Sequence, residues 1–96
     1  MKDLSYSYLS QSLKTIEAEA FVSTHFEAVA IRSGCITIGN LAFAGCDKLI
    51  CIRIPSSVTS IADNAFANDS LVIISPSNSY AIDWANQHDL MFIEQE

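Results

Sequence analysis

The chain of 96 residues has few basic side chains: five Lys and Arg stand against eleven Asp and Glu, which gives a net charge of −6. This sign disfavours binding to a nucleic-acid backbone or to an anionic membrane surface, so we expect no nucleic acid as a partner. Charged residues make up only 17% of the chain and hydrophobic residues 50%, which is too apolar for a disordered protein. We therefore expect one packed unit spanning residues 1–96.

Long hydrophobic runs are also missing. No window approaches the roughly 18 consecutive apolar residues of a membrane helix, and the first residues lack the apolar stretch of a signal peptide. We therefore expect no membrane insertion and find no targeting signal in these residues. The three cysteines, Cys35, Cys46 and Cys51, cannot all pair within the chain and lack metal-site spacing. We expect reduced thiols, some of them buried, with a Cys46–Cys51 disulfide as the alternative.

The sequence does contain an internal repeat. Segments that end in Ala-Phe recur, so that Phe21, Phe43 and Phe66 follow one another at spacings of 22 and 23 residues. Other apolar positions keep the same register, and Ser7 marks the first repeat as irregular. The aligned columns are Leu4, Phe26, Leu49 and Leu71; Leu9, Ile31 and Ile54; Leu13, Cys35 and Val58; Ile16, Ile38 and Ile61; and Ser7, Val29, Ile52 and Ile74.

This period predicts a leucine-rich repeat solenoid, in which stacked coils bury the columns that a single repeat cannot cover. We expect right-handed coils of about 22–23 residues, each adding one short strand to a parallel sheet. The coils are predicted at residues 4–25, 26–48 and 49–70, with a partial coil at 71–77. The strands are predicted at residues 4–9, 26–31, 49–54 and 71–74, and a second set of extended stretches at 13–16, 35–38 and 58–61.

Two segments resemble a known family. Residues 52–66 read Ile-Arg-Ile-Pro-Ser-Ser-Val-Thr-Ser-Ile-Ala-Asp-Asn-Ala-Phe, and residues 38–46 read Ile-Gly-Asn-Leu-Ala-Phe-Ala-Gly-Cys. Both are similar to the BspA-like leucine-rich repeat family, whose pattern runs Leu-x-x-Ile-x-Ile-Pro-x-x-Val-x-x-Ile-Gly-x-x-Ala-Phe-x-x-Cys, and the resemblance covers about residues 4–76. It departs from the pattern at Arg32 in place of Pro, at Ala62 in place of Gly and at Asp69 near the position of Cys46, which we expect to loosen turns only.

The last residues, 78–96, resemble the helix and strand that cap such arrays. Ser79 can cap a helix, and Trp84 is expected to cover the open end of the Phe column rather than to contact a ligand. Asp83 and His88 suit the helix dipole. The predicted apolar stripe of this helix is Tyr80, Ala81, Trp84 and Ala85. Because no comparable cap precedes Leu4, we expect the chain to be the C-terminal part of a longer array, able to self-associate through its N-terminal edge strand.

Residues for catalysis are scarce. Only His25 and His88 are available as a base, and His25 aligns with the turn residues Lys48 and Ser70, so we expect it to be solvated. Glu17 and Glu19 are interpreted as a solvated, charged edge. The dispersed glycines form no phosphate loop. We expect no enzymatic activity, no cofactor and no metal.

Alternation along the predicted strands identifies the side chains that point away from the core. Tyr and Arg are enriched at interface hot spots, so the candidate binding residues are Tyr6, Tyr8, Arg32 and Arg53; a plain solvated face is the alternative. The full set of predicted outward positions is Tyr6, Tyr8 and Ser10; Ala28, Ala30 and Arg32; Cys51, Arg53 and Pro55; and Ile73, Ser75 and Ser77.

Two functions are compatible with these features. The first is a non-enzymatic binding module that presents its parallel sheet to a protein or glycan; the family resemblance implies an adhesin-like role and a cell-surface or secreted location. The alternative is a structural cap or spacer at the C-terminal end of a longer repeat array.

Overall fold

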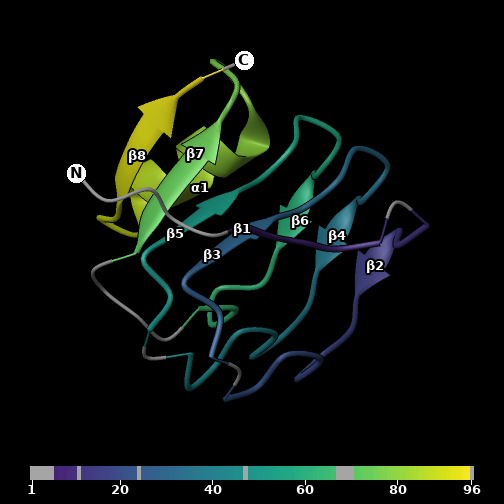
Figure 1. The fold of residues 1–96 in the computed structure, drawn as a ribbon. Coiled ribbons are helices and arrows are strands. Elements are labelled where there is room, and N and C mark those ends of the chain that lie inside the picture. Colours follow the sequence, from purple (N-terminus) through teal and green to yellow (C-terminus); the bar gives the residue numbers. More distant parts are fainter. Residues whose placement is uncertain (1–5, 11, 24, 47, 67–70, 96) are drawn as a thin grey trace.

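The computed structural model describes residues 6–10, 12–23, 25–46, 48–66 and 71–95, and for Tyr6 only the backbone. The chain forms a solenoid of parallel strands closed by a helix and a strand, as the sequence predicted (Figure 1). One sheet has the order β1 (Tyr6–Tyr8), β3 (Ala28–Ala30), β5 (Cys51–Arg53), β7 (Val72–Ser75) and β8 (Met91–Glu94). The other has the order β2 (Thr15–Ile16), β4 (Thr37–Ile38) and β6 (Ser60–Ile61).

Each strand lies within or overlaps its predicted segment; β7 has the predicted four residues, and the strands of the three coils before it are shorter than predicted. Each strand is short because the chain turns away from the sheet after a few residues. The residues that flank a strand make single backbone hydrogen bonds to the adjacent coil. The predictions for Leu4, Asp69 and Ser70 lie outside the described residues.

The register between β5 and β7 corrects the predicted alignment of the last coil. Ile52 pairs with Ile73 and not with Ile74, because this coil reaches its strand after 21 residues (52 to 73), one fewer than the predicted alignment assumed. A shift of one residue moves every side chain of a strand to the opposite face. Ile73 and Ser75, predicted to point outward, therefore lie in the core, and Ile74 lies on the outer face. Ser77 is exposed in the turn after β7.

The phenylalanine column forms a continuous stack through the interior. Phe43 lies between Phe21 and Phe66, with ring centroids 5.3 and 5.4 Å apart and the rings nearly parallel. The backbone of the same segments is also paired, since the N–H groups of Phe21 and Phe43 each donate to the next coil at 2.8 Å, to Ala42 and Ala65 respectively. Adjacent coils are thus hydrogen-bonded along this side as well as along both sheets.

Helix α1 (Tyr80–Gln87) closes the C-terminal end of the stack, lying against β6, β7 and β8 (Figure 1). The hydroxyl of Ser79 accepts a hydrogen bond from the Ile82 N–H, which caps the helix as predicted. Trp84 is buried and meets Phe66 edge-on at 5.6 Å, so it covers the end of the phenylalanine column. No helix among the described residues is long and apolar enough to span a bilayer.

The predicted apolar stripe of this helix is wrong at one position. Tyr80 is 39% exposed, and Ile82 is buried in its place beside Ala81, Trp84 and Ala85. The phenol of a tyrosine needs a polar partner, and here it accepts a hydrogen bond from the Ile61 N–H at 3.4 Å, at the edge of the cap rather than inside it.

Candidate functional site

The outer face of the five-stranded sheet carries two rows of side chains. They follow from the parallel, in-register pairing, in which alternate residues of each strand share a face. Between the rows, the side chains of Val29, Ile52 and Ile73 point into the core and are fully buried. The first outer row is Ala28, Cys51, Val72 and Met91, in register with the backbone of Tyr6, and the second is Tyr8, Ala30, Arg53, Ile74 and Ile93.

Two of the predicted binding residues contact each other on this face. The Arg32 guanidinium carbon lies 5.2 Å from the centre of the Tyr8 ring, within the range of a cation–π interaction. Arg32 is exposed and Tyr8 is 63% exposed, so both remain accessible to a partner. The two side chains come from different coils, and the contact exists only because β1 and β3 are paired.

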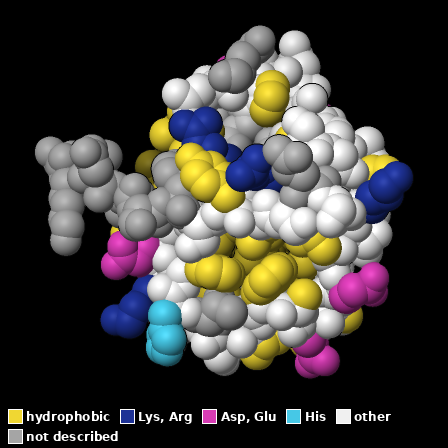
Figure 2. Space-filling view, turned by 45° about the vertical axis from the view of Figure 1, so that its right-hand side comes forward, with side chains coloured by type: hydrophobic (Ala, Val, Ile, Leu, Met, Phe, Trp, Pro, Cys, Tyr) yellow, Lys and Arg dark blue, Asp and Glu magenta, His cyan; other side chains and the backbone are white. Residues whose placement is uncertain are grey.

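Arg53 lies in the same row as Tyr8, with Ala30 between them. Two strand spacings separate their backbones by about 10 Å. The small side chain of Ala30 leaves the Tyr8 ring and the half-buried Arg53 standing above the sheet. Figure 2 shows basic side chains gathered beside hydrophobic ones on this part of the surface, with the visible acidic side chains farther out.

Tyr6, the fourth predicted residue, is placed by its backbone alone. It pairs with Ala28 at the start of the first outer row. The structure therefore brings Tyr8, Arg32 and Arg53 together and fixes Tyr6 only by register.

The sequence reasoning missed an apolar extension of this face. Strand β8 adds Met91 and Ile93 to the two rows, and these side chains are 71% and 51% exposed. Next to them lie Val72 and Ile74, which join Ala28 and Cys51 in a small apolar cluster separate from the main core. The residues after 78 were interpreted only as a cap. Met91 and Ile93 alternate in a segment expected to be a strand, and this alternation could have revealed the extension.

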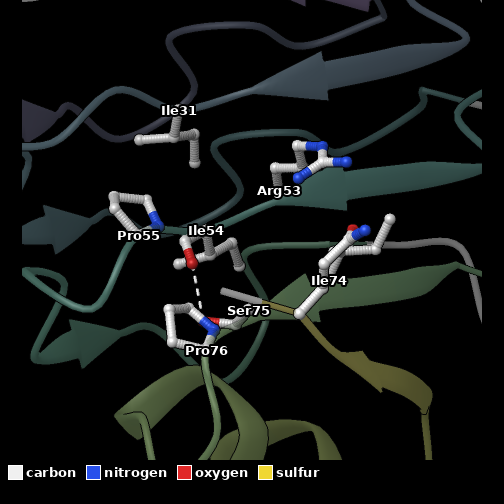
Figure 3. Close-up of a pocket in the computed structure, with 8 residues that line it drawn as sticks. Ile31, Arg53, Ile54, Pro55, Ile74, Ser75 and Pro76 are labelled. Carbon is white, nitrogen blue, oxygen red and sulfur yellow. Dashed lines mark hydrogen bonds between the residues drawn. The ribbon is translucent and has the colours of Figure 1, made fainter.

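A groove opens beside Arg53, at the ends of β3, β5 and β7, with a volume of about 190 Å³. Figure 3 shows Pro55 and Pro76 on one side of it and Arg53 and Ile74 on the other. At its floor the Ser75 hydroxyl donates to the Ile54 carbonyl at 2.6 Å and accepts from the Ser79 hydroxyl at 2.8 Å. The described residues that line the groove are Ile31, Arg53, Ile54, Pro55, Ile74, Ser75, Pro76 and Gln95.

The two histidines and the pair Glu17 and Glu19 lie outside the two outer rows. His25 is exposed in its turn, as predicted, beside a second hollow of about 240 Å³ formed with Ser7, Phe26 and Glu27. Glu17 and Glu19 are exposed, as predicted. His88 belongs to the cap: its ring stacks on Trp84 at 4.0 Å, and its Nε2 lies 3.4 Å from a carboxylate oxygen of Asp63.

The thiols are part of the packing. Cys35, Cys46 and Cys51 are all buried and none is joined in a disulfide. Burial raises the pKa of the Cys35 thiol above its ordinary value, partly offset by hydrogen bonds with the backbone at Thr37 and Ile36. A raised pKa keeps this sulfur in its poorly nucleophilic thiol form. Among the described residues no cluster of three or more His, Cys, Asp and Glu side chains could hold a metal ion.

Comparison with known proteins adds one finding. The family model described as a BspA type leucine-rich repeat region matches residues 1–84, in six copies. No curated protein matches the chain, and no solved structure matches it.

Proposed function

The chain belongs to the BspA-type leucine-rich repeat family, and we propose that it is a binding module whose outer sheet face recognises a protein partner. Repeat solenoids offer extended surfaces of this kind, built from equivalent positions of successive coils. The family resemblance makes the proposed role adhesin-like, at a cell surface or outside the cell.

The observation that carries this proposal is the stacked pair of Tyr8 and Arg32 beside Arg53. Tyrosine and arginine supply most of the binding energy at many interfaces, because each offers a large contact area together with polar groups. The contact between Tyr8 and Arg32 favours one arrangement of the two side chains before binding, which reduces the entropy lost when a partner binds. Together with Arg53, they form a basic and aromatic site on a chain of net charge −6.

The same geometry supports a role without catalysis. The two histidines lie outside the outer rows, and the described titratable groups form no arrangement of nucleophile, base and orienting carboxylate around a cavity. The module is proposed to act by binding alone.

A structural cap within a longer array is the second candidate function. Leu13 in the first coil is half-buried, whereas Cys35 and Val58 in the same column are completely buried. Phe21 is likewise half-buried beside the buried Phe43. These first-coil side chains would be covered by a further coil packed against them, while α1 and Trp84 close the opposite end.

A binding screen with matched variants tests the proposal. The parent chain is screened against purified extracellular matrix proteins and glycans beside two double variants, Arg32→Ser with Arg53→Ser, and Lys14→Ser with Lys48→Ser. Both variants lose two positive charges, but Lys14 and Lys48 are exposed outside the two outer rows. We expect a protein to bind the parent and the lysine variant and to lose affinity for the arginine variant, each checked to remain folded.

Three results would contradict the proposal. Equal loss in both variants would show that only net charge matters, and binding confined to glycans would show that the partner is not a protein. No binding at all, together with concentration-dependent self-association of the parent in sedimentation, would favour the structural cap.

A further inference from the structure

We infer that the groove beside Arg53 holds an apolar side chain of an acidic peptide segment, whose carboxylates bind Arg53 and Arg32. This inference rests on the proposed function and deepens it, because it assigns a chemical class to the part of the partner that contacts the face. Three features of the groove support it.

The first feature is size. At about 190 Å³, the groove is smaller than the roughly 300–1,000 Å³ of typical small-molecule sites, so it suits one side chain better than a whole cofactor or drug-sized ligand. It is also open along the ends of the strands. A chain lying across the coils could insert one residue and continue along the face in both directions.

The second feature is the lining. Ile31, Ile74 and the rings of Pro55 and Pro76 present carbon to the groove (Figure 3). The hydroxyl at the floor belongs to Ser75, and it is already engaged with the Ile54 carbonyl and the Ser79 hydroxyl. Gln95 also lines the groove, but at its exposed margin, and the floor has little to offer the hydroxyl groups of a sugar. An aliphatic side chain therefore matches the floor better than a glycan does.

The third feature is charge. Arg53 is the only charged side chain among the described residues that line the groove. Ile31, which also lines the groove, is followed directly by Arg32, whose guanidinium group lies over Tyr8. A guanidinium group binds a carboxylate through paired hydrogen bonds, so two arginines next to an apolar groove favour acidic residues flanking an apolar one.

Peptide titration of the whole chain tests this inference. The probe is an acetylated and amidated heptapeptide with one leucine flanked by aspartates, and its two controls replace the leucine with glycine or the aspartates with asparagines. Binding is followed by the chemical shifts of the isotope-labelled chain at peptide concentrations up to the millimolar range. Arg53→Gln and Lys48→Gln, which remove the same charge, serve as the protein variants.

We expect the leucine peptide to bind about tenfold more tightly than the glycine peptide, because the groove removes the aliphatic side chain from water. The largest shift changes should fall on the groove residues. Arg53→Gln should reduce the preference for aspartate over asparagine, with Arg32 supplying what remains, and Lys48→Gln should leave the preference unchanged.

Each other result is decisive. Equal binding of the leucine and glycine peptides would overturn the groove inference while leaving the wider face as the binding surface. Equal binding of the aspartate and asparagine peptides would overturn the assignment of an acidic partner. If none of the peptides binds while a protein from the screen still depends on Arg32 and Arg53, this inference fails and the proposed function stands.

Discussion

At the scale of single residues, Phe43 is the side chain whose truncation tests the packing of the interior most directly. It is 1% exposed and is stacked between Phe21 and Phe66. Phe43→Ala should lower the free energy of unfolding by about 3–5 kcal/mol, because both stacking partners lose contact and a cavity remains. That is a large share of the stability of a small domain. Urea unfolding followed by circular dichroism measures the loss.

Phe21→Ala is the matched control for this prediction. Phe21 is half-buried at the first coil and has one stacked phenylalanine neighbour within the column, so its truncation should cost clearly less. A loss below about 1 kcal/mol for Phe43→Ala would contradict the burial of Phe43 in the phenylalanine column.

The Cys35 thiol gives a prediction about pH. Burial raises its pKa, so the folded state keeps the neutral form. Well below the ordinary thiol pKa of about 8.5, the thiol is neutral in both states and adds no pH dependence. As the pH rises further, the unfolded chain ionises first, and stability falls until the pH passes the folded pKa. The parent should therefore lose more stability than Cys35→Val between pH 7.5 and 10.

Valine is the appropriate replacement because Val58 occupies the equivalent buried position in the next coil. The measurement is the urea midpoint of both proteins at each pH, with the other two cysteines present in both. Parallel pH curves for the parent and Cys35→Val would show that Cys35 does not contribute.

At the scale of the elements, the contact between coils depends on Gly39. A Cβ atom at this position would lie 2.7 Å from the Ile16 carbonyl oxygen and 2.8 Å from the Ala18 nitrogen, both backbone atoms of the preceding coil. Gly39→Ala should therefore push the first two coils apart at β2 and β4. We expect a loss of about 1–3 kcal/mol in unfolding free energy, as for other overpacked sites.

Ala62→Gly is the control, since Ala62 occupies the same place one coil later. It should cost no more than about 1 kcal/mol, the usual effect of added backbone freedom. If Gly39→Ala unfolds with an unchanged midpoint, the coils are not in close backbone contact there.

The elements also show where sequence reasoning succeeds and where it stops. The columns that contain Phe43, Val58 and Ile61 could be aligned because stacked coils repeat the same buried positions. The last coil broke this rule: its strand arrives one residue early, and Ile74 changes face. A gain or loss of one residue in a turn leaves the apolar pattern almost unchanged, so the pattern alone could not reveal it.

The candidate site was predictable to a similar degree. Alternation placed Tyr8, Arg32 and Arg53 on one face, because every coil repeats the direction of its strand. It did not reveal the contact of Arg32 with Tyr8, which depends on side-chain conformation. Nor did it reveal the groove, because Gln95 and Pro76 meet there only after β8 has paired with β7.

At the scale of the whole molecule, the proposed binding face differs in charge from the chain as a whole. The chain carries a net charge of −6, yet Arg32 and Arg53 lie close together on the outer face of the five-stranded sheet. The apolar side chains of Met91 and Ile93 extend the same face at the opposite edge. A partner that covers both parts would combine acidic and apolar groups.

Site-specific photocrosslinking to a protein recovered in the binding screen tests the central claim most directly. Benzoylphenylalanine is placed at Tyr8 on the outer face in one chain, and in the other at Thr59, which is exposed next to β6 in the second sheet. We predict that the partner crosslinks from position 8 and not from position 59. Crosslinking from position 59 alone would contradict recognition through the outer face.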